Sequence, residues 1–100
     1  MNSSQSVQPK VVAFVPNLMD RSKFTDSVTF VTTGDEARRA QPDQIFVDLD
    51  RCSDISQFRF EGPEVIGFGP HVDSELARQA KEAGYDEVVT RSVFFNRLTT

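Results

Sequence analysis

The feature that most constrains the fold is a series of short apolar runs, rich in β-branched and phenylalanine side chains and each closed by proline, glycine or polar residues. Continuous apolar runs of this length are typical of strands that are buried on both faces of a parallel sheet. The sequence therefore predicts five strands, and the runs are 10–15, 28–32, 45–47, 65–70 and 87–90.

Segments with helical character separate these runs. The clearest is 73–83, DSELARQAKEA, whose apolar residues recur at helical spacing and form one face. Asp73 is expected to cap its first turn, and Gly84 is expected to end it in a left-handed conformation. The other predicted elements are a short helix at 34–41, one or two turns at 18–25 with Leu18, Met19 and Phe24 as apolar members, a turn or irregular loop at 55–60, and a helix at 92–98 with Val93, Phe94 and Leu98 facing the core.

The alternation of strand and helix predicts an α/β fold with a parallel sheet and right-handed crossovers. One hundred residues are enough for one domain with one core. We expect that domain to span residues 10–100, preceded by a polar tail at residues 1–9 that is disordered or loosely held.

Charge and cysteine content narrow the function classes. The net charge is -4, with acids and bases interspersed, so nothing favours nucleic-acid or membrane binding. Cys52 has no cysteine partner for a disulfide, and one Cys with one His cannot make a zinc site. The polar N-terminal stretch lacks the apolar core of a signal peptide. These features predict a cytoplasmic protein without a cofactor.

The run VIGFGPHVDSELARQAKEAGYDEVVTRSVFFNRL, residues 65–98, resembles the second half of response-regulator receiver domains. In that family a fourth strand ends in a small or hydroxyl residue, a helix ends in Ala-Gly, and a fifth strand ends in Lys-Pro. The corresponding pieces here are Gly69, Ala83-Gly84 and Thr90-Arg91-Ser92. The stretch FVDLD resembles the third strand of the family, with Asp48 at the phospho-acceptor position. The resemblance covers roughly residues 10–98 and is most specific in the last third.

The resemblance implies a flavodoxin-like, three-layer fold with five parallel strands in the order 2-1-3-4-5, here with shortened helices. It also implies a pocket at the carboxyl ends of the strands, where receivers bind Mg²⁺ and accept a phosphoryl group from a histidine kinase. The corresponding positions in this chain are Asn17, Asp48, Gly69 and Arg91.

Several departures indicate a degenerate receiver. The acidic pair that holds magnesium is replaced by Val15-Pro16-Asn17, and Asp20 is the nearest acid. Gly69 replaces the hydroxyl residue that moves toward the phosphate, and Arg91-Ser92 replaces Lys-Pro. Mg²⁺ needs several hard oxygen ligands in near-octahedral order, so its binding should be weak here. Our leading hypothesis is therefore a phosphorylation-independent signalling domain, not an enzyme, that binds another protein or a second copy of itself.

Two alternatives stay open at this point. One is an atypical receiver that is phosphorylated on Asp48; the other is a small-ligand binder at the carboxyl ends of the strands, where open α/β sheets place ligands. Asp48 itself is either that acceptor or a strand-end acid paired with Arg91. Asp50 is expected to cap the segment after Leu49.

The sequence also allows an interpretation of three further kinds of residue: the histidine, the cysteine and two glycines. His71 is expected to be a hydrogen-bonding loop residue. Cys52 beside Arg51 is either a thiol of lowered pKa or an ordinary, partly buried one. Gly67 and Gly69 lack the third glycine of a dinucleotide-binding loop and are interpreted as sites of close backbone approach and turning.

The last prediction concerns an interaction surface. Receivers commonly bind partners through the surface made by the fourth helix, the fifth strand and the fifth helix. Its counterpart here would include Arg78, Lys81, Tyr85 and Phe95. Aromatic side chains among charges are common at protein interfaces and also occur singly on monomers.

Overall fold

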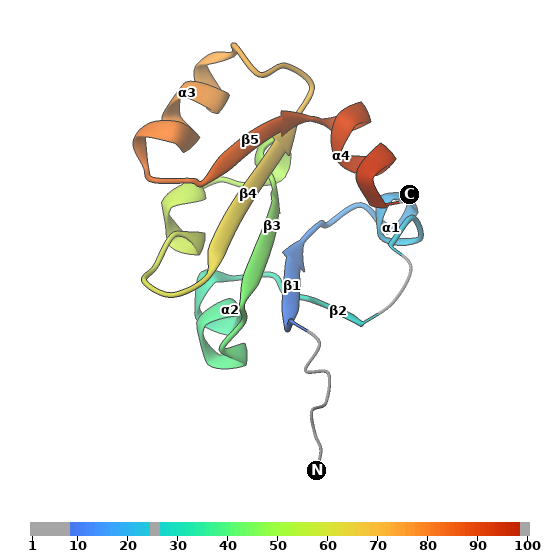
Figure 1. Cartoon of the computed structure of the whole chain (residues 1–100), viewed down its shortest axis with the longest axis vertical. Helices are drawn as coiled ribbons and strands as arrows, with labels where there is room; N and C mark the ends of the chain where they lie inside the picture. Colours follow the sequence, from blue (N-terminus) through green and yellow to red (C-terminus); the bar gives the residue numbers. More distant parts are fainter. Residues whose placement is uncertain (1–8, 25–26, 99–100) are drawn as a thin grey trace.

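The computed structural model describes residues 9–24 and 27–98 of the chain. Five strands form one all-parallel sheet in the order β2-β1-β3-β4-β5, which confirms the predicted flavodoxin-like arrangement (Figure 1). The strands are β1 (Val11–Phe14), β2 (Val28–Phe30), β3 (Gln44–Asp48), β4 (Glu64–Gly69) and β5 (Glu87–Thr90). Residues 1–8 of the predicted N-terminal tail lie outside the described residues.

The helices are short, as expected. The α-helices are α1 (Leu18–Arg21), α2 (Gly34–Ala40), α3 (Glu75–Glu82) and α4 (Arg91–Leu98), and the crossover from β3 to β4 contains the 3₁₀ turns η2 (Leu49–Arg51) and η3 (Ile55–Phe58).

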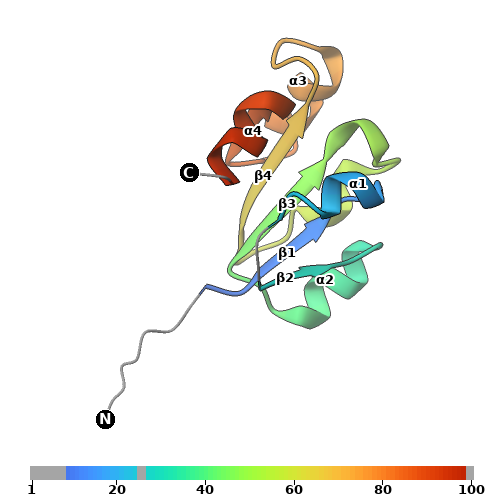
Figure 2. The same ribbon diagram turned by 90° about the vertical axis from the view of Figure 1, so that its right-hand side faces the viewer.

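Strand residues alternate between two apolar clusters on opposite faces of the sheet, as the pleat requires. On one face α2, η3 and α3 cover a cluster centred on Val12, Ile45, Phe58 and Val65. On the other face α4 and the α1 segment cover a cluster rich in phenyl rings (Figures 1 and 2). Its members and bordering residues include Phe24, Phe30, Phe46, Phe68, Phe94 and Phe95.

Helix starts differ from the prediction in two places. Ser74, not Asp73, caps α3: its hydroxyl accepts from the amide of Ala77 at 3.1 Å. The last helix begins at Arg91 and not at Ser92, because the Thr90 hydroxyl accepts from the amide of Val93 at 3.2 Å. In both cases the residue with the right backbone and oxygen position satisfies the first-turn amides.

The crossover from β3 to β4 corrects the role of Asp50. This residue lies inside η2, whereas Asp54 caps η3 by accepting from the amide of Ser56. Leu49, in η2, is buried against β4. A β-carbon on Gly67 would lie 3.0 Å from the Leu49 side chain, so glycine here permits the expected close approach.

Three apolar residues of α1 and α4 are exposed, and one of them, Val93, was predicted to face the core. Leu18 and Met19 on α1 keep 73% and 78% of their surface accessible, and Val93 on α4 keeps 43%. Phe94 and Leu98 pack within or against the aromatic cluster as predicted, and Phe24 also packs against it. The short α1 cannot turn more than one side toward the sheet, and that side is used by Asp20.

None of the helices in residues 9–24 and 27–98 combines the length and the apolar character that are needed to cross a bilayer.

Candidate functional site

Four predicted pocket positions lie at the carboxyl edge of the sheet. Asp48 is the last residue of β3, Gly69 is the last residue of β4, and Arg91 begins α4 directly after β5. Asn17 caps α1 after β1, and its side-chain oxygen accepts from the amides of Met19 and Asp20. The parallel topology therefore gathers segments that are far apart in the sequence.

Arg91 contacts side chains from several of the segments that meet at the carboxyl edge of the sheet. Its guanidinium donates to Asp20 Oδ2 at 2.6 Å and lies 3.5 Å from Asp48 Oδ2. The guanidinium also lies over the rings of Phe68 and Phe95, at 5.7 Å and 5.4 Å from their centroids. Arginine suits this position because its planar fork can face two carboxylates and stack on aromatic rings.

Asp48 is fully buried. Neither carboxylate oxygen receives a hydrogen bond from the described residues, although Arg91 lies close by. Burial raises the pKa of Asp48 above its ordinary value, and the charges of Arg91 and Asp20 act on it in opposite directions. A buried carboxylate with one cation and no hydrogen bonds is an unfavourable place for negative charge.

Asp20 behaves differently although it shares the same arginine. Burial alone would raise the pKa of Asp20, but the hydrogen bond and charge of Arg91, with help from Lys23, hold that pKa below its ordinary value. Lys23 lies 3.5 Å from Asp20 and also over the ring of Phe95. The same hydrogen bond with Asp20 raises the pKa of Arg91, which keeps it protonated.

Asp20 is the member of the site that sequence reasoning missed. It is the nearest acid after β1, but its distance from the strand end argues against a place in the pocket. One helical turn after the Asn17 cap turns Asp20 inward, to 5% exposure. The available signal was the spacing of a cap and an acid three residues later, ahead of a short helix.

The residues do not fit the magnesium ion that the resemblance implies. A divalent ion between Asp20 and Asp48 would have to take the place of the Arg91 guanidinium. Asn17 uses its side-chain oxygen for the helix cap. Across residues 9–24 and 27–98, no group of three or more Asp, Glu, His or Cys side chains is arranged to hold a metal. The Arg91 guanidinium therefore lies where a metal ion shared by Asp20 and Asp48 would have to bind.

The remaining sequence candidates at this edge take ordinary roles. Burial raises the pKa of the Cys52 thiol, which contradicts the alternative of a lowered pKa beside Arg51. His71 is exposed in the loop after β4, and its carbonyl accepts from the Ser74 hydroxyl at 3.3 Å. Gly69 is buried, and a β-carbon there would come no closer than 4.0 Å to Leu49.

Only some residues of the predicted interaction surface are exposed to solvent. Arg78 and Lys81 are exposed on α3, where Arg78 pairs with Glu75 and Glu82 of its own helix. Tyr85 was predicted to lie on this surface, and that is wrong: it is 6% exposed, and its hydroxyl donates to the Ile55 carbonyl at 2.7 Å. The amide of Tyr85 donates to the Ala80 carbonyl at the end of α3, so the exit from the helix directs the ring inward.

Phe95 is half-buried on α4, on the opposite face of the sheet from α3. Its ring touches Phe24, Phe68 and Phe94 and carries Lys23 above it at 4.7 Å. The α1 segment, with its exposed residues Leu18 and Met19, lies on the same side of the sheet as Phe95 and not on the side of α3. Phe95 therefore lies on one side of the edge strand β5, and Arg78 and Lys81 of α3 lie on the other.

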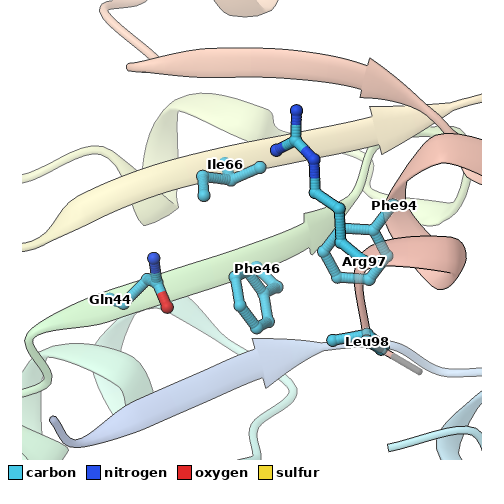
Figure 3. A pocket seen from close by; sticks show the side chains of 6 residues that line it. All are labelled: Gln44, Phe46, Ile66, Phe94, Arg97 and Leu98. Atoms are coloured by element: carbon cyan, nitrogen blue, oxygen red, sulfur yellow. The ribbon is translucent and has the colours of Figure 1, made fainter. Parts of the chain in front are cut away.

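A groove lies beside α4 on the same face of the sheet (Figure 3). Its volume is about 260 Å³. Phe46 and Ile66 come from the neighbouring strands β3 and β4, while Phe94 and Leu98 come from α4. Gln44 and Arg97 complete the lining, and their polar atoms pair with Glu64 and Glu87 respectively. The groove is thus an apolar floor with polar groups at its border.

Comparisons with known proteins add no identification: no protein-family model, curated protein or solved structure matches the chain.

Proposed function

We propose that this chain is a receiver-like module that binds another protein without being phosphorylated. The observation that carries the proposal is the arrangement around Asp48, which is fully buried beside a guanidinium that is itself held by Asp20. Asp48, at the position that corresponds to the phospho-acceptor, is therefore packed inside the fold and is not exposed to a phosphoryl donor.

Phosphoryl transfer makes demands that this arrangement opposes. The acceptor oxygen must be reached in line by the donor, and cations must offset charge on the phosphoryl oxygens. At Asp48 the approach is closed and the nearby cation is shared with Asp20. At Gly69 there is no hydroxyl to respond to a phosphate. A domain of this kind can transmit information through what it contacts.

Exposed apolar side chains support the protein-binding part of the proposal. Leu18 and Met19 are adjacent and lie outside the core, at the energetic cost that solvent exposure of large apolar groups carries. The same face of the sheet carries half-buried phenyl rings and arginines that stack on aromatic rings, a composition that is enriched at protein interfaces.

The test is an amide NMR spectrum recorded with and without beryllofluoride and Mg²⁺, a mimic of the phosphorylated state. We expect the spectra to coincide, and to coincide equally for Asp48→Asn, which cannot form the complex. Large shifts centred on Asp48 in the native chain and absent from the variant would refute the proposal and favour an atypical receiver. Incubation with acetyl phosphate, followed by a search for a hydroxylamine-sensitive label, gives an independent answer.

A further inference from the structure

The two faces of the sheet are covered unequally. One face carries α2, η3 and α3, whereas the other carries the single turn α1 and the helix α4 (Figures 1 and 2). An eight-residue helix is about 12 Å long. On the second face Val28, Phe30, Phe46 and Leu98 consequently remain only partly buried. The groove beside α4 lies in this region, which residues 9–24 and 27–98 leave partly uncovered.

We call this side the α1–α4 face, defined by Leu18, Met19, Lys23, Phe46, Phe95 and Leu98. The α1 segment and α4 form one continuous surface, because Phe24 touches the rings of Phe94 and Phe95 and Lys23 lies over Phe95. The groove continues that surface, because it shares Phe46 and Phe94 with the aromatic cluster.

Charge distinguishes this face from the remainder of the molecule. Segments 17–24 and 91–98 contain four basic residues and one acidic residue, a net charge of +3, whereas the whole chain carries -4. Neighbouring acids reduce this excess, since Asp48 and Glu87 pair with arginines of the same face. Lys23, half exposed above a phenyl ring, still presents positive charge outward. The helices that cover the opposite side of the sheet, α2 and α3, each contain two acidic and two basic residues and carry no net charge.

We infer that the α1–α4 face is a docking surface for an acidic amphipathic helix of a partner protein; this rests on the proposed function and names its surface and the chemistry of its partner. An added helix would complete the missing layer and bury the groove with its apolar stripe, the usual mode of helix-in-groove recognition. Acidic residues flanking that stripe would meet the cations at Lys23 and Arg21, whose charges lie over aromatic rings. A second copy is less suited, because two chains of charge -4 repel each other.

The experiment titrates ¹⁵N-labelled protein with a synthetic helical peptide that has leucines at i, i+3, i+4 and i+7 and glutamates elsewhere. A matched peptide with lysines in place of the glutamates tests charge. We expect the acidic peptide to shift amides of α1, β3, β4 and α4, to bind more tightly than the basic peptide, and to lose affinity as salt is added.

Matched variants localise the effect. Lys23→Glu should weaken the acidic peptide about fivefold, since reversing an exposed charge contributes up to about 1 kcal/mol. Lys81→Glu makes the same change on α3 and should leave the affinity within about twofold. Met19→Ser should weaken binding about tenfold through lost apolar contact. Val72→Ser, also an exposed apolar residue, should have no such effect. All four positions are exposed, and the same spectra check that each variant keeps the native fold before its affinity is compared.

Failure of this inference can be distinguished from failure of the proposed function. Shifts on α2 and α3, equal affinity for the two peptides, or no binding by either would overturn the α1–α4 face as an acidic-helix site, whatever the beryllofluoride spectra show. A response to beryllofluoride with peptide binding retained would instead remove the claim of phosphorylation independence and leave this surface standing.

Discussion

Replacing either carboxylate that faces Arg91 should change stability, and the two replacements should act in opposite directions. Asp20→Asn removes the charge that accepts the 2.6 Å hydrogen bond from Arg91. Asp48→Asn removes a charge that lies 3.5 Å from the same guanidinium without accepting a hydrogen bond from any described residue. The side-chain shape is preserved in both variants, so the comparison isolates the charges.

The magnitudes follow from the two environments. A hydrogen bond to a charged group contributes roughly 1.5–3 kcal/mol. Because Arg91 is one-third exposed, solvent screening reduces this, and we expect Asp20→Asn to lose about 1–2 kcal/mol. For Asp48, attraction to Arg91 at 3.5 Å amounts to about 5 kcal/mol at an effective dielectric constant near 20. Desolvation of a buried ion costs several kcal/mol and is not offset by hydrogen bonds. We therefore expect desolvation to outweigh the attraction, in agreement with the pKa of Asp48, which burial raises although Arg91 lowers it.

Asp48→Asn should therefore be as stable as the native chain at neutral pH, or more stable by about 1–2 kcal/mol. The pH dependence separates the two variants further. The folded-state pKa of Asp48 is raised, so its charge destabilises the fold above that pKa, and the advantage of Asp48→Asn shrinks as the pH falls from it toward 3.8. The folded-state pKa of Asp20 is lowered, so the deficit of Asp20→Asn is present above 3.8 and disappears only as the pH falls below it.

Urea unfolding of the three proteins at neutral and mildly acidic pH measures both effects, with far-UV circular dichroism as the signal. A separation of about 2 kcal/mol between the variants corresponds to roughly 10 °C in Tm for a domain of this size. If Asp48→Asn loses as much stability as Asp20→Asn at neutral pH, the Asp48–Arg91 attraction outweighs desolvation and the reasoning about the buried carboxylate is refuted.

Three further predictions test packing and local structure by thermal or urea unfolding. Gly34→Ala should lower the free energy of unfolding by about 2–3 kcal/mol, because the added β-carbon would collide with the carbonyl oxygen of Gln57 in η3. Gly69→Ala is the control, since its β-carbon would meet no atom closer than 4.0 Å, and it should change stability by less than about 1 kcal/mol. Similar losses in both variants would contradict the close approach of α2 to η3. Ser74→Ala should lose about 1 kcal/mol through the α3 cap, and Asp73→Ala should lose almost nothing; the reverse order would restore Asp73 as the cap. Burial raises the pKa of Tyr85, the single tyrosine of the chain, so its absorbance should not show tyrosinate before alkaline unfolding, and Tyr85→Phe should lose about 1 kcal/mol; ionisation near pH 10 in the folded protein would mean that the ring is exposed.

The candidate site shows where sequence reasoning reached and where it stopped. Asp48, Gly69 and Arg91 follow strands whose apolar runs are evident, so their common edge could be predicted. Asp20 could not be placed with them, because its direction depends on how far α1 turns before the chain leaves the sheet. Tyr85 was misplaced for a related reason, since the exit path from α3 decides whether its ring lies inside.

By itself, the pattern of buried apolar runs and short helical connections predicted five parallel strands, and the resemblance to receiver domains supplied their order, which the structure confirms. Only the tertiary structure decided which side of the sheet stays incompletely covered, and that Arg91 shares its charge between two carboxylates. The spacing of apolar residues and the positions of turn residues report on contacts between residues that are close to one another in the sequence. The burial of a charge and the reach of a guanidinium depend on groups 71 and 43 residues away, whose approach is set by the packing of the whole sheet.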